Sequence, residues 1–179
     1  MSIELLAKQG REQAHTGLAG IDSSKLSMMR NAHLKECFAH VDEMRYRMEF
    51  VARIRGIEFI NDASSTTVNA TWYSLENMGR NTVWIASATS AHTDYTRLRN
   101  VAARKVKMLI CVGEHNEQLH KAFDGVVKNI VDVATVGEAA HKALYNDLEN
   151  TTVIYSPAVE NGKSIEELGE RFAREVNDL

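Results

Sequence analysis

The chain has 179 residues, of which 44% are hydrophobic and 25% are charged, as is usual for a globular protein with one core. Its formal net charge of -3 argues against a nucleic-acid-binding protein, which would normally present a basic surface. No apolar run approaches the roughly 20 residues of a membrane span and the first residues lack the apolar region of a signal peptide, so we expect a cytoplasmic protein that binds neither nucleic acid nor membrane.

The first 45 residues are expected to form an N-terminal helical arm. Residues 1–24 contain three glycines and only a short apolar patch, which is typical of a loosely attached segment. Residues 25–44 carry apolar side chains at helical spacing, which predicts an amphipathic helix. Its apolar stripe consists of Leu26, Met29, Leu34, Cys37, Phe38, Val41 and Met44. Such a stripe must pack against something, so we expect a homo-oligomer or a protein partner.

Residues 46–179 are expected to form the main domain, which opens with a β-hairpin. A period of two predicts a strand over residues 48–55, with one face formed by Met48, Phe50, Ala52 and Ile54. Gly56 supplies the turn, and residues 57–60 resume as a second strand.

The rest of the domain alternates short apolar runs with helical stretches. The runs are rich in valine and isoleucine, as expected for strands covered on both faces, and they span residues 82–87, 107–113, 129–134 and 151–156. Asp94 is predicted to cap one helix, and Ser164 with Glu167 to form a capping box before the last. This alternation predicts an α/β fold: a mostly parallel sheet with helices on both faces and the hairpin adding one antiparallel strand at an edge.

Ligands of such sheets bind beyond the carboxyl ends of the strands. One of these loops, residues 156–163, is followed by Ser164, so that Gly162, Lys163 and Ser164 match the end of a phosphate-binding P-loop. The full motif requires glycine at the position of Pro157, which has no N–H to offer a phosphate. We therefore expect no bound nucleotide cofactor.

Metal binding is not predicted either. His92 and Asp94 lie two residues apart, but the sequence shows no third ligand beside them. Cys37 and Cys111 do not form a Cys-x-x-Cys pair, and each lies in an apolar stretch, which is typical of reduced cysteines in a core.

The loop after the hairpin, "NDASSTT" at residues 61–67, carries a resemblance to a known family. With its flanking strands, and with "TVWIAS", "KVKMLICVG", "VIYSPA" and "ELGERF" following in order, it resembles the C-terminal domain of the Mur ligases, above all the D-glutamate-adding type. The resemblance implies a Rossmann-like fold. It also implies that ATP binds to a separate central domain, of which residues 1–45 correspond at most to the tail.

The resemblance further implies which residues face the incoming amino acid. Asn61, Asp62 and Thr66 match family residues, whereas Ser64 and Ala91 stand where the family has lysines. Without these cations a dianionic amino acid loses the charges that would offset its desolvation. We therefore expect no catalytic residue. Together with residues of the other loops at the carboxyl ends of the strands, the candidate ligand-binding residues are Asn61, Asp62, Ser64, Thr66, His92, Asn161 and Lys163. In a purely structural alternative, Thr66 or Thr67 caps the next helix and Asp62 binds loop amides.

The sequence is compatible with three functions. The first is a non-catalytic binding or assembly module linked to peptidoglycan precursor synthesis. The second is the amino-acid-binding half of a split D-glutamate ligase that works with a separate ATP-binding chain. The third is a small-molecule enzyme that uses the serine-rich loop with His92 and Asp94.

Overall fold

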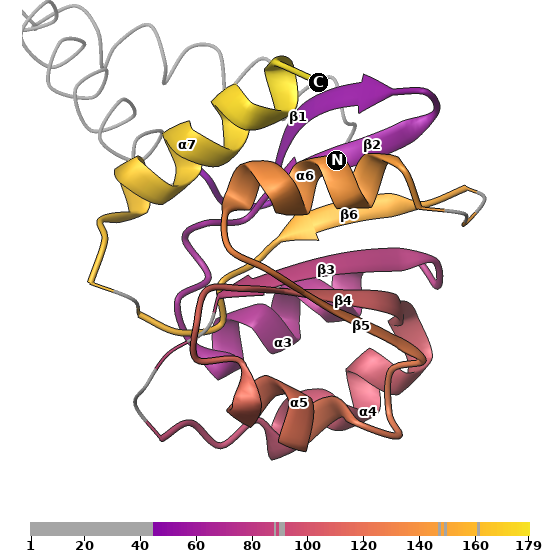
Figure 1. Cartoon of the computed structure of the whole chain (residues 1–179), viewed down its shortest axis with the longest axis vertical. Helices are drawn as coiled ribbons and strands as arrows, with labels where there is room; N and C mark the ends of the chain where they lie inside the picture. Colours follow the sequence, from indigo (N-terminus) through magenta and orange to yellow (C-terminus); the bar gives the residue numbers. More distant parts are fainter. Residues whose placement is uncertain (1–44, 88, 90–91, 147, 149, 161) are drawn as a thin grey trace, which may run out of the picture. The chain divides into compact units, whose positions relative to one another are not determined.

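The computed structural model describes residues 45–179 except 88, 90–91, 147, 149 and 161 (Figure 1). The chain divides into two compact units, Met1–Met44 and Arg45–Leu179. The arm and the amphipathic helix predicted for the first 45 residues lie almost wholly outside the described residues. No helix in the described part of the chain has the length and apolar character needed to cross a membrane.

The second unit is built on a sheet of six strands in the order β1-β2-β6-β3-β4-β5. The strands are β1 (Glu49–Ile54), β2 (Ile57–Asn61), β3 (Thr82–Ser87), β4 (Val106–Val112), β5 (Asn129–Val133) and β6 (Thr152–Tyr155). β1 pairs with β2 antiparallel, and every other neighbouring pair is parallel. The predicted mostly parallel sheet with an antiparallel edge hairpin is therefore confirmed.

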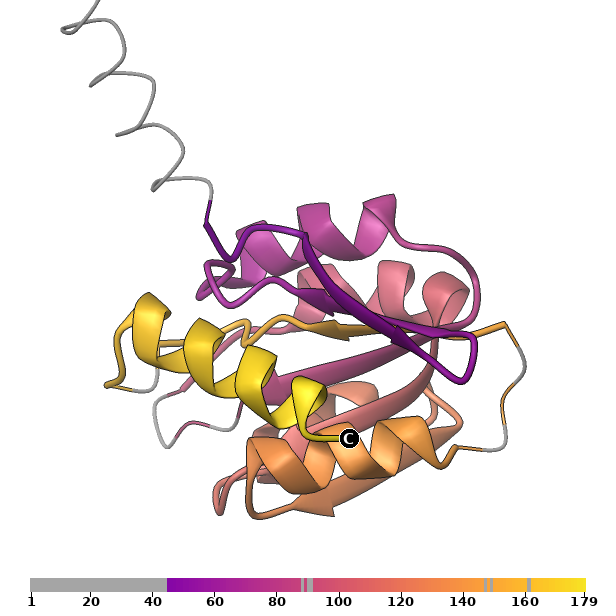
Figure 2. The same cartoon turned by 90° about the horizontal axis from the view of Figure 1, so that it is seen from above.

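Helices cover both faces of this sheet (Figures 1 and 2). They are α3 (Val68–Asn77), α4 (Thr96–Lys105), α5 (Glu117–Phe123), α6 (Val136–Leu144) and α7 (Ile165–Asn177). One face packs against α6 and α7, where the ring of Tyr155 stacks on Phe172 at 5.0 Å. The opposite face packs against α3, α4 and α5, where Trp84 meets Phe123 edge-on at 5.2 Å. The two hydrophobic cores therefore share the central strands, and β3 is buried along its whole length.

The first strand departs from the predicted alternation. The register between β1 and β2 shifts between Phe50 and Ala52, which marks a β-bulge. As a result Val51 packs against the core, whereas Phe50 is 56% exposed. Grouping Phe50 on one face with Ala52 and Ile54 was wrong, because a bulge adds a residue that reverses the alternation on one side of it.

Three helices begin at the side-chain caps that their sequences favour. Thr67, Thr135 and Ser164 accept hydrogen bonds from backbone N–H groups in the first turns of α3, α6 and α7. The cap predicted at Asp94 is wrong by one position: α4 begins at Thr96, with Tyr95 preceding it. The Asp94 carboxylate nevertheless accepts a hydrogen bond from the N–H of Thr96 at 2.9 Å.

Candidate functional site

The loop that follows β2 lies at the carboxyl ends of the central parallel strands. Tyr155 of β6 is in register with Asn61 of β2 on one side and with Ile85 of β3 on the other. The N–H of Asp62 donates to the carbonyl of Tyr155 at 2.9 Å, so β2 continues its pairing into the loop. The N–H of Ala158 donates to the carbonyl of Ser65 at 3.0 Å. The loops after β2 and β6 are therefore bound to each other through their backbones.

Asn61 is buried and serves to position α7. Its side-chain Nδ2 donates to the carbonyl of Gly169 in α7 at 2.9 Å, and its Oδ1 accepts from the N–H of Ala63 at 3.3 Å. The helix can approach this closely because residue 169 has no side chain. A Cβ there would lie 2.3 Å from Cδ1 of Tyr46. Both polar ends of the Asn61 amide are thus occupied by the protein itself.

Asp62 is a fully buried carboxylate. Its Oδ1 accepts a hydrogen bond from the N–H of Met48 at 3.2 Å. Burial raises the pKa of Asp62 above its ordinary value, and the nearby hydroxyls of Ser74, Ser65 and Ser156 offset part of that rise. None of the three reaches Oδ2 with hydrogen-bond geometry, so this oxygen has no partner among the described residues. Burying a carboxylate with one unsatisfied oxygen costs free energy of folding.

Buried hydroxyls fill the space between the loop, α3 and the end of β6. The hydroxyl of Thr71 lies 2.9 Å from that of Ser156 and donates to the carbonyl of Ser65 at 3.2 Å. The hydroxyl of Ser65 lies 3.2 Å from that of Ser74, and Trp84 Nε1 donates to the carbonyl of Ser156 at 2.8 Å. The sequence carries no signal that points to Thr71, Ser74 or Ser156, because lone hydroxyl residues in a helix or after a strand have no distinctive spacing.

Some of the remaining predicted site residues lie in the same loop as Asp62, and the others lie elsewhere. Ser64 and Thr66 are half-buried in the same loop as Asp62, and Thr67, rather than Thr66, caps α3. Lys163 is exposed just before α7, where its Nζ lies 3.9 Å from Glu167 Oε1. Asn161 lies outside the described residues.

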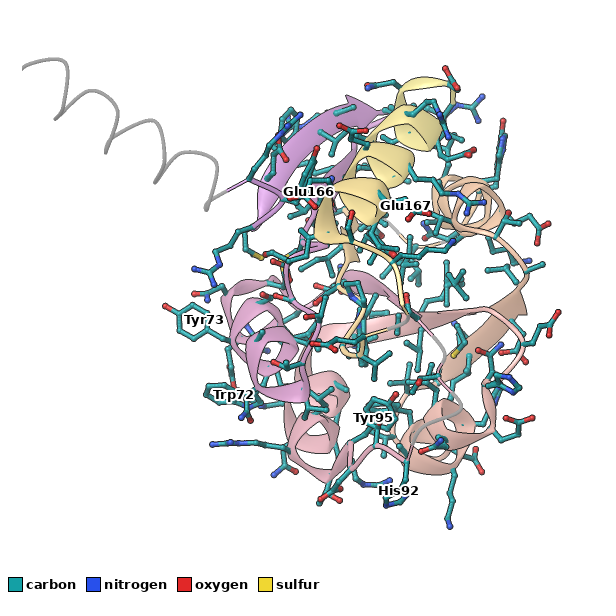
Figure 3. All side chains as sticks on the ribbon, turned by 90° about the vertical axis from the view of Figure 1, so that its left-hand side faces the viewer. Trp72, Tyr73, His92, Tyr95, Glu166 and Glu167 are labelled. Carbon is teal, nitrogen blue, oxygen red and sulfur yellow. The ribbon has the colours of Figure 1, made fainter. Side chains whose placement is uncertain are left out.

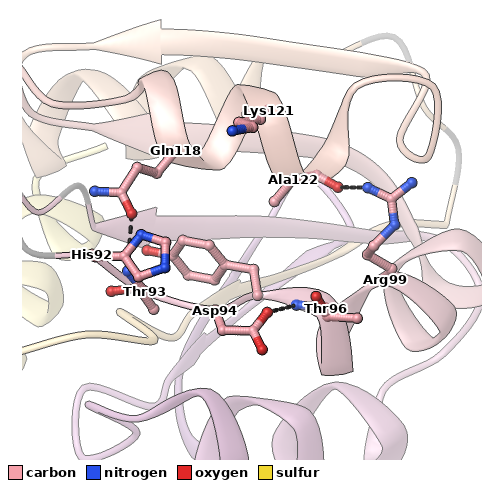
Figure 4. A pocket seen from close by; sticks show the side chains of 9 residues that line it. His92, Thr93, Asp94, Thr96, Arg99, Gln118, Lys121 and Ala122 are labelled. Atoms are coloured by element: carbon pink, nitrogen blue, oxygen red, sulfur yellow. Dashed lines mark hydrogen bonds between the residues drawn. The ribbon is translucent and has the colours of Figure 1, made fainter.

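His92 and Asp94 line a separate cavity of about 290 Å³ between the loop after β3 and helices α4 and α5 (Figure 4). The full lining consists of His92, Thr93, Asp94, Tyr95, Thr96, Arg99, Gln118, Lys121 and Ala122. Hydrogen bonds to the N–H and side chain of Thr96 lower the pKa of the exposed Asp94 carboxyl. No residue of the loop at 61–67 contributes to this lining, so the cavity does not join His92 to the serine-rich loop.

Figure 3 shows the labelled side chains from the side of the molecule where α3 lies. Trp72 and Tyr73 project from α3, and His92 lies near Tyr95 in another part of this view. The guanidinium carbon of Arg97 lies over the Trp72 ring, 6.0 Å from the ring centre. Tyr73 is 67% exposed to solvent. The outer face of α3 therefore offers aromatic surface beside the candidate site.

No protein-family model matches the chain. The chain is 35% identical over 182 residues to the UDP-N-acetylmuramoylalanine–D-glutamate ligase of Porphyromonas gingivalis, and 33% identical over 183 residues to that of Bacteroides fragilis. Both alignments cover 100% of this chain, but the chain spans only 40% and 41% of the two ligases.

Two solved structures show the same fold. A murein peptide ligase from Psychrobacter arcticus superposes with a TM-score of 0.50 at 14% identity, covering 75% of this chain and 30% of that chain. MurF from Acinetobacter baumannii superposes with a TM-score of 0.52 at 12% identity, covering 73% and 31%. At such low identity these likenesses establish the architecture alone.

Proposed function

We propose that this chain, a homologue of the D-glutamate-adding Mur ligases with the fold of a Mur ligase C-terminal domain, is a non-catalytic module of peptidoglycan precursor synthesis. Its role would be to bind or assemble other components rather than to join an amino acid itself. The proposal covers only the homologous region, because the chain spans 40% of the length of the P. gingivalis ligase.

One observation carries the proposal: the loops after β2 and β3 have no cation at the two positions where the family resemblance places lysines. By the family resemblance, Ser64 and Ala91 occupy positions at which lysines would hold the amino acid. Ser64 is half-buried and uncharged, and its neighbour Asp62 adds a negative charge when ionised. A dianionic D-glutamate entering this loop would lose water without gaining an ion pair, which is unfavourable.

The test is a titration of the full chain with D-glutamate followed by amide NMR. We expect no saturable shift at Thr66 for the natural chain. Restoring both cations in the double variant Ser64→Lys, Ala91→Lys should produce saturable shifts, because fixed charges would then compensate the carboxylates. The matched control is Ser64→Met, Ala91→Met, which adds comparable length without charge and should remain silent. Saturable binding by the natural chain would contradict the proposal.

A second candidate is the amino-acid-binding half of a split ligase. The observation in its favour is identity distributed over the whole chain to proteins named as D-glutamate ligases. It differs from the first in requiring a separate ATP-binding chain. Recovery of D-glutamate ligase activity when such a chain is added to this one would support it, and activity of the added chain alone would be the control.

A further inference from the structure

Three side chains with metal-ligating atoms converge near the sheet edge formed by β4 and β5. Cys111 on β4 and Asp132 on β5 are register partners in a parallel pair, so their side chains leave the sheet on the same face. His120 comes from α5, which packs on that face. One ligating atom from each residue lies within 4.8 Å of the other two.

The histidine and the carboxylate are already in direct contact. Nε2 of His120 lies 2.9 Å from Oδ1 and 3.0 Å from Oδ2 of Asp132. The His120 side chain is 42% exposed and that of Asp132 is 53% exposed, so an ion can reach this pair from solvent. An exposed histidine–aspartate pair contributes little to stability by itself. The buried sulfur beside it is the feature that distinguishes this pair from an ordinary surface contact.

A fourth polar group lies next to the three. Asn116 is only 7% exposed, and its Nδ2 donates to the carbonyl of Gly113 at 3.0 Å. Its Oδ1 has no hydrogen-bond partner within the described part of the chain. Asn116, His120 and Asp132 line one cavity of about 490 Å³. The cavity therefore opens to solvent beside His120 and Asp132, two of the three metal-ligating residues, and the unsatisfied amide side chain of Asn116 lines the same cavity.

The chemistry of the three ligating groups indicates which metal ions they would bind. A thiolate, an imidazole and a carboxylate suit zinc and its neighbours in the transition series, whereas magnesium and calcium take oxygen ligands. In a tetrahedral zinc site, ligand bonds of 2.0–2.3 Å place the donor atoms roughly 3.5 Å apart. Atoms that already lie within 4.8 Å of one another need to close by about 1 Å, which side-chain rotation can supply.

We propose that Cys111, His120 and Asp132 form a binding site for a divalent transition-metal ion, zinc above all, with a fourth position open toward the cavity that Asn116 lines. The site is independent of the function proposed above. Binding forms a metal–sulfur bond and releases the thiol proton to solvent, because the thiolate is the ligating form.

Cobalt(II) is the probe, because a cobalt–thiolate bond gives a charge-transfer absorption that histidine and carboxylate alone do not. We expect the full chain to develop this band with one equivalent of cobalt and to lose it when zinc is added. Cys111→Ser should abolish the band, whereas Cys37→Ser, which removes the other cysteine, should leave it unchanged.

His120→Ala and Asp132→Asn should each weaken cobalt binding at least 10-fold, the effect seen even for residues that only support a metal ligand. The matched control is His141→Ala, since His141 is an exposed helix histidine that stacks on Tyr145 instead. Circular dichroism identifies any variant that fails to fold. If another variant fails to fold, the cobalt binding of Asp132→Asn, a substitution at an exposed position, decides the test. The absence of a charge-transfer band in the natural chain, or a band that persists in Cys111→Ser, would overturn the proposal.

Discussion

At the scale of single residues, the candidate site contains one group whose burial costs free energy of folding, the carboxylate of Asp62. Its carboxylate is fully buried, and its surroundings provide hydroxyls and one backbone N–H but no cation within hydrogen-bond distance among the described residues. Burial without a counter-charge disfavours the ionised form, which raises the pKa. A folded-state pKa above the unfolded value means that the folded chain binds this proton more readily than the unfolded chain.

The substitution Asp62→Asn should therefore stabilise the protein at neutral pH relative to the natural chain. The natural carboxyl group stabilises the fold when it is protonated, below its ordinary pKa of 3.8, and this contribution is lost as pH rises through the raised folded-state value. Asparagine does not titrate, so its advantage should be largest at neutral pH and should shrink as the pH falls toward 3.8. Urea unfolding of both chains across this range measures the difference.

The matched control for this experiment is Asp94→Asn. Asp94 has a lowered pKa because Thr96 donates to its ionised form, so its stabilising contribution is lost as pH falls. The two variants should thus show pH trends of opposite sign. A constant difference between Asp62→Asn and the natural chain at every pH would mean that the charge of Asp62 plays no part.

At the scale of elements, α7 is held by a close approach that depends on one glycine. The ring of Tyr46 occupies the space where a side chain at residue 169 would begin, and Asn61 donates to the carbonyl of the same residue. Phe172, about one turn further along the same side of the helix, packs into the core, where it stacks on Tyr155. The position of α7 therefore fixes the end of β2, and through it the start of the loop at the candidate site.

Gly169→Ala should destabilise the protein by about 1–3 kcal/mol, the usual cost of forcing a methyl group into packed surroundings. The new Cβ would lie 2.3 Å from the Tyr46 ring, so the ring or the helix must move. Gly79→Ala is the control, because a Cβ at Gly79 would have no atom within 4 Å. Chemical denaturation measures both. Equal midpoints for the two variants would show that the helix is not held at this contact.

Sequence patterns predicted the helices and strands well because hydrophobic periodicity and capping residues are both local signals. The strand expected at 82–87 occupies those residues, and Ser164 caps α7. The bulge in β1 was missed because its cause lies in pairing with β2 rather than in the strand's own alternation. The cluster of Cys111, His120 and Asp132 was missed for a similar reason: its members are 9 and 12 residues apart on three elements, and only the fold brings them together.

The place of the candidate site in the fold could be predicted from the sequence, but the contacts and the burial of its side chains could not. The topology rule placed it at the carboxyl ends of the strands, and the structure brings Asn61, Asp62, Ser64 and Thr66 together there. The rule could not reveal that Asn61 binds α7 and that Asp62 lies beneath the loop, because burial depends on how the loops after β2 and β6 join.

At the scale of the whole molecule, the unit Arg45–Leu179 has a hydrophobic core on each face of its sheet. The large hydrophobic side chains that the described part exposes come from separate elements, namely Phe50, Tyr73, Tyr145 and Ile165. Scattered residues of this kind are normal on a monomer and do not require a partner.

We propose that the apolar stripe predicted over residues 26–44, which lie outside the described residues, mediates self-association or binding to another protein. A positive charge at the stripe position Phe38 should dissociate the complex while leaving the circular dichroism of the sheet domain intact, since a charge is costly to bury in an apolar interface. Ala39→Lys is the matched control, because helical spacing places residue 39 opposite the stripe. Sedimentation velocity at high micromolar concentration measures the association. If the natural chain sediments as a monomer and specifically recovers no protein from extract, the stripe has no partner; if Phe38→Lys instead unfolds the sheet domain, the stripe is part of the core.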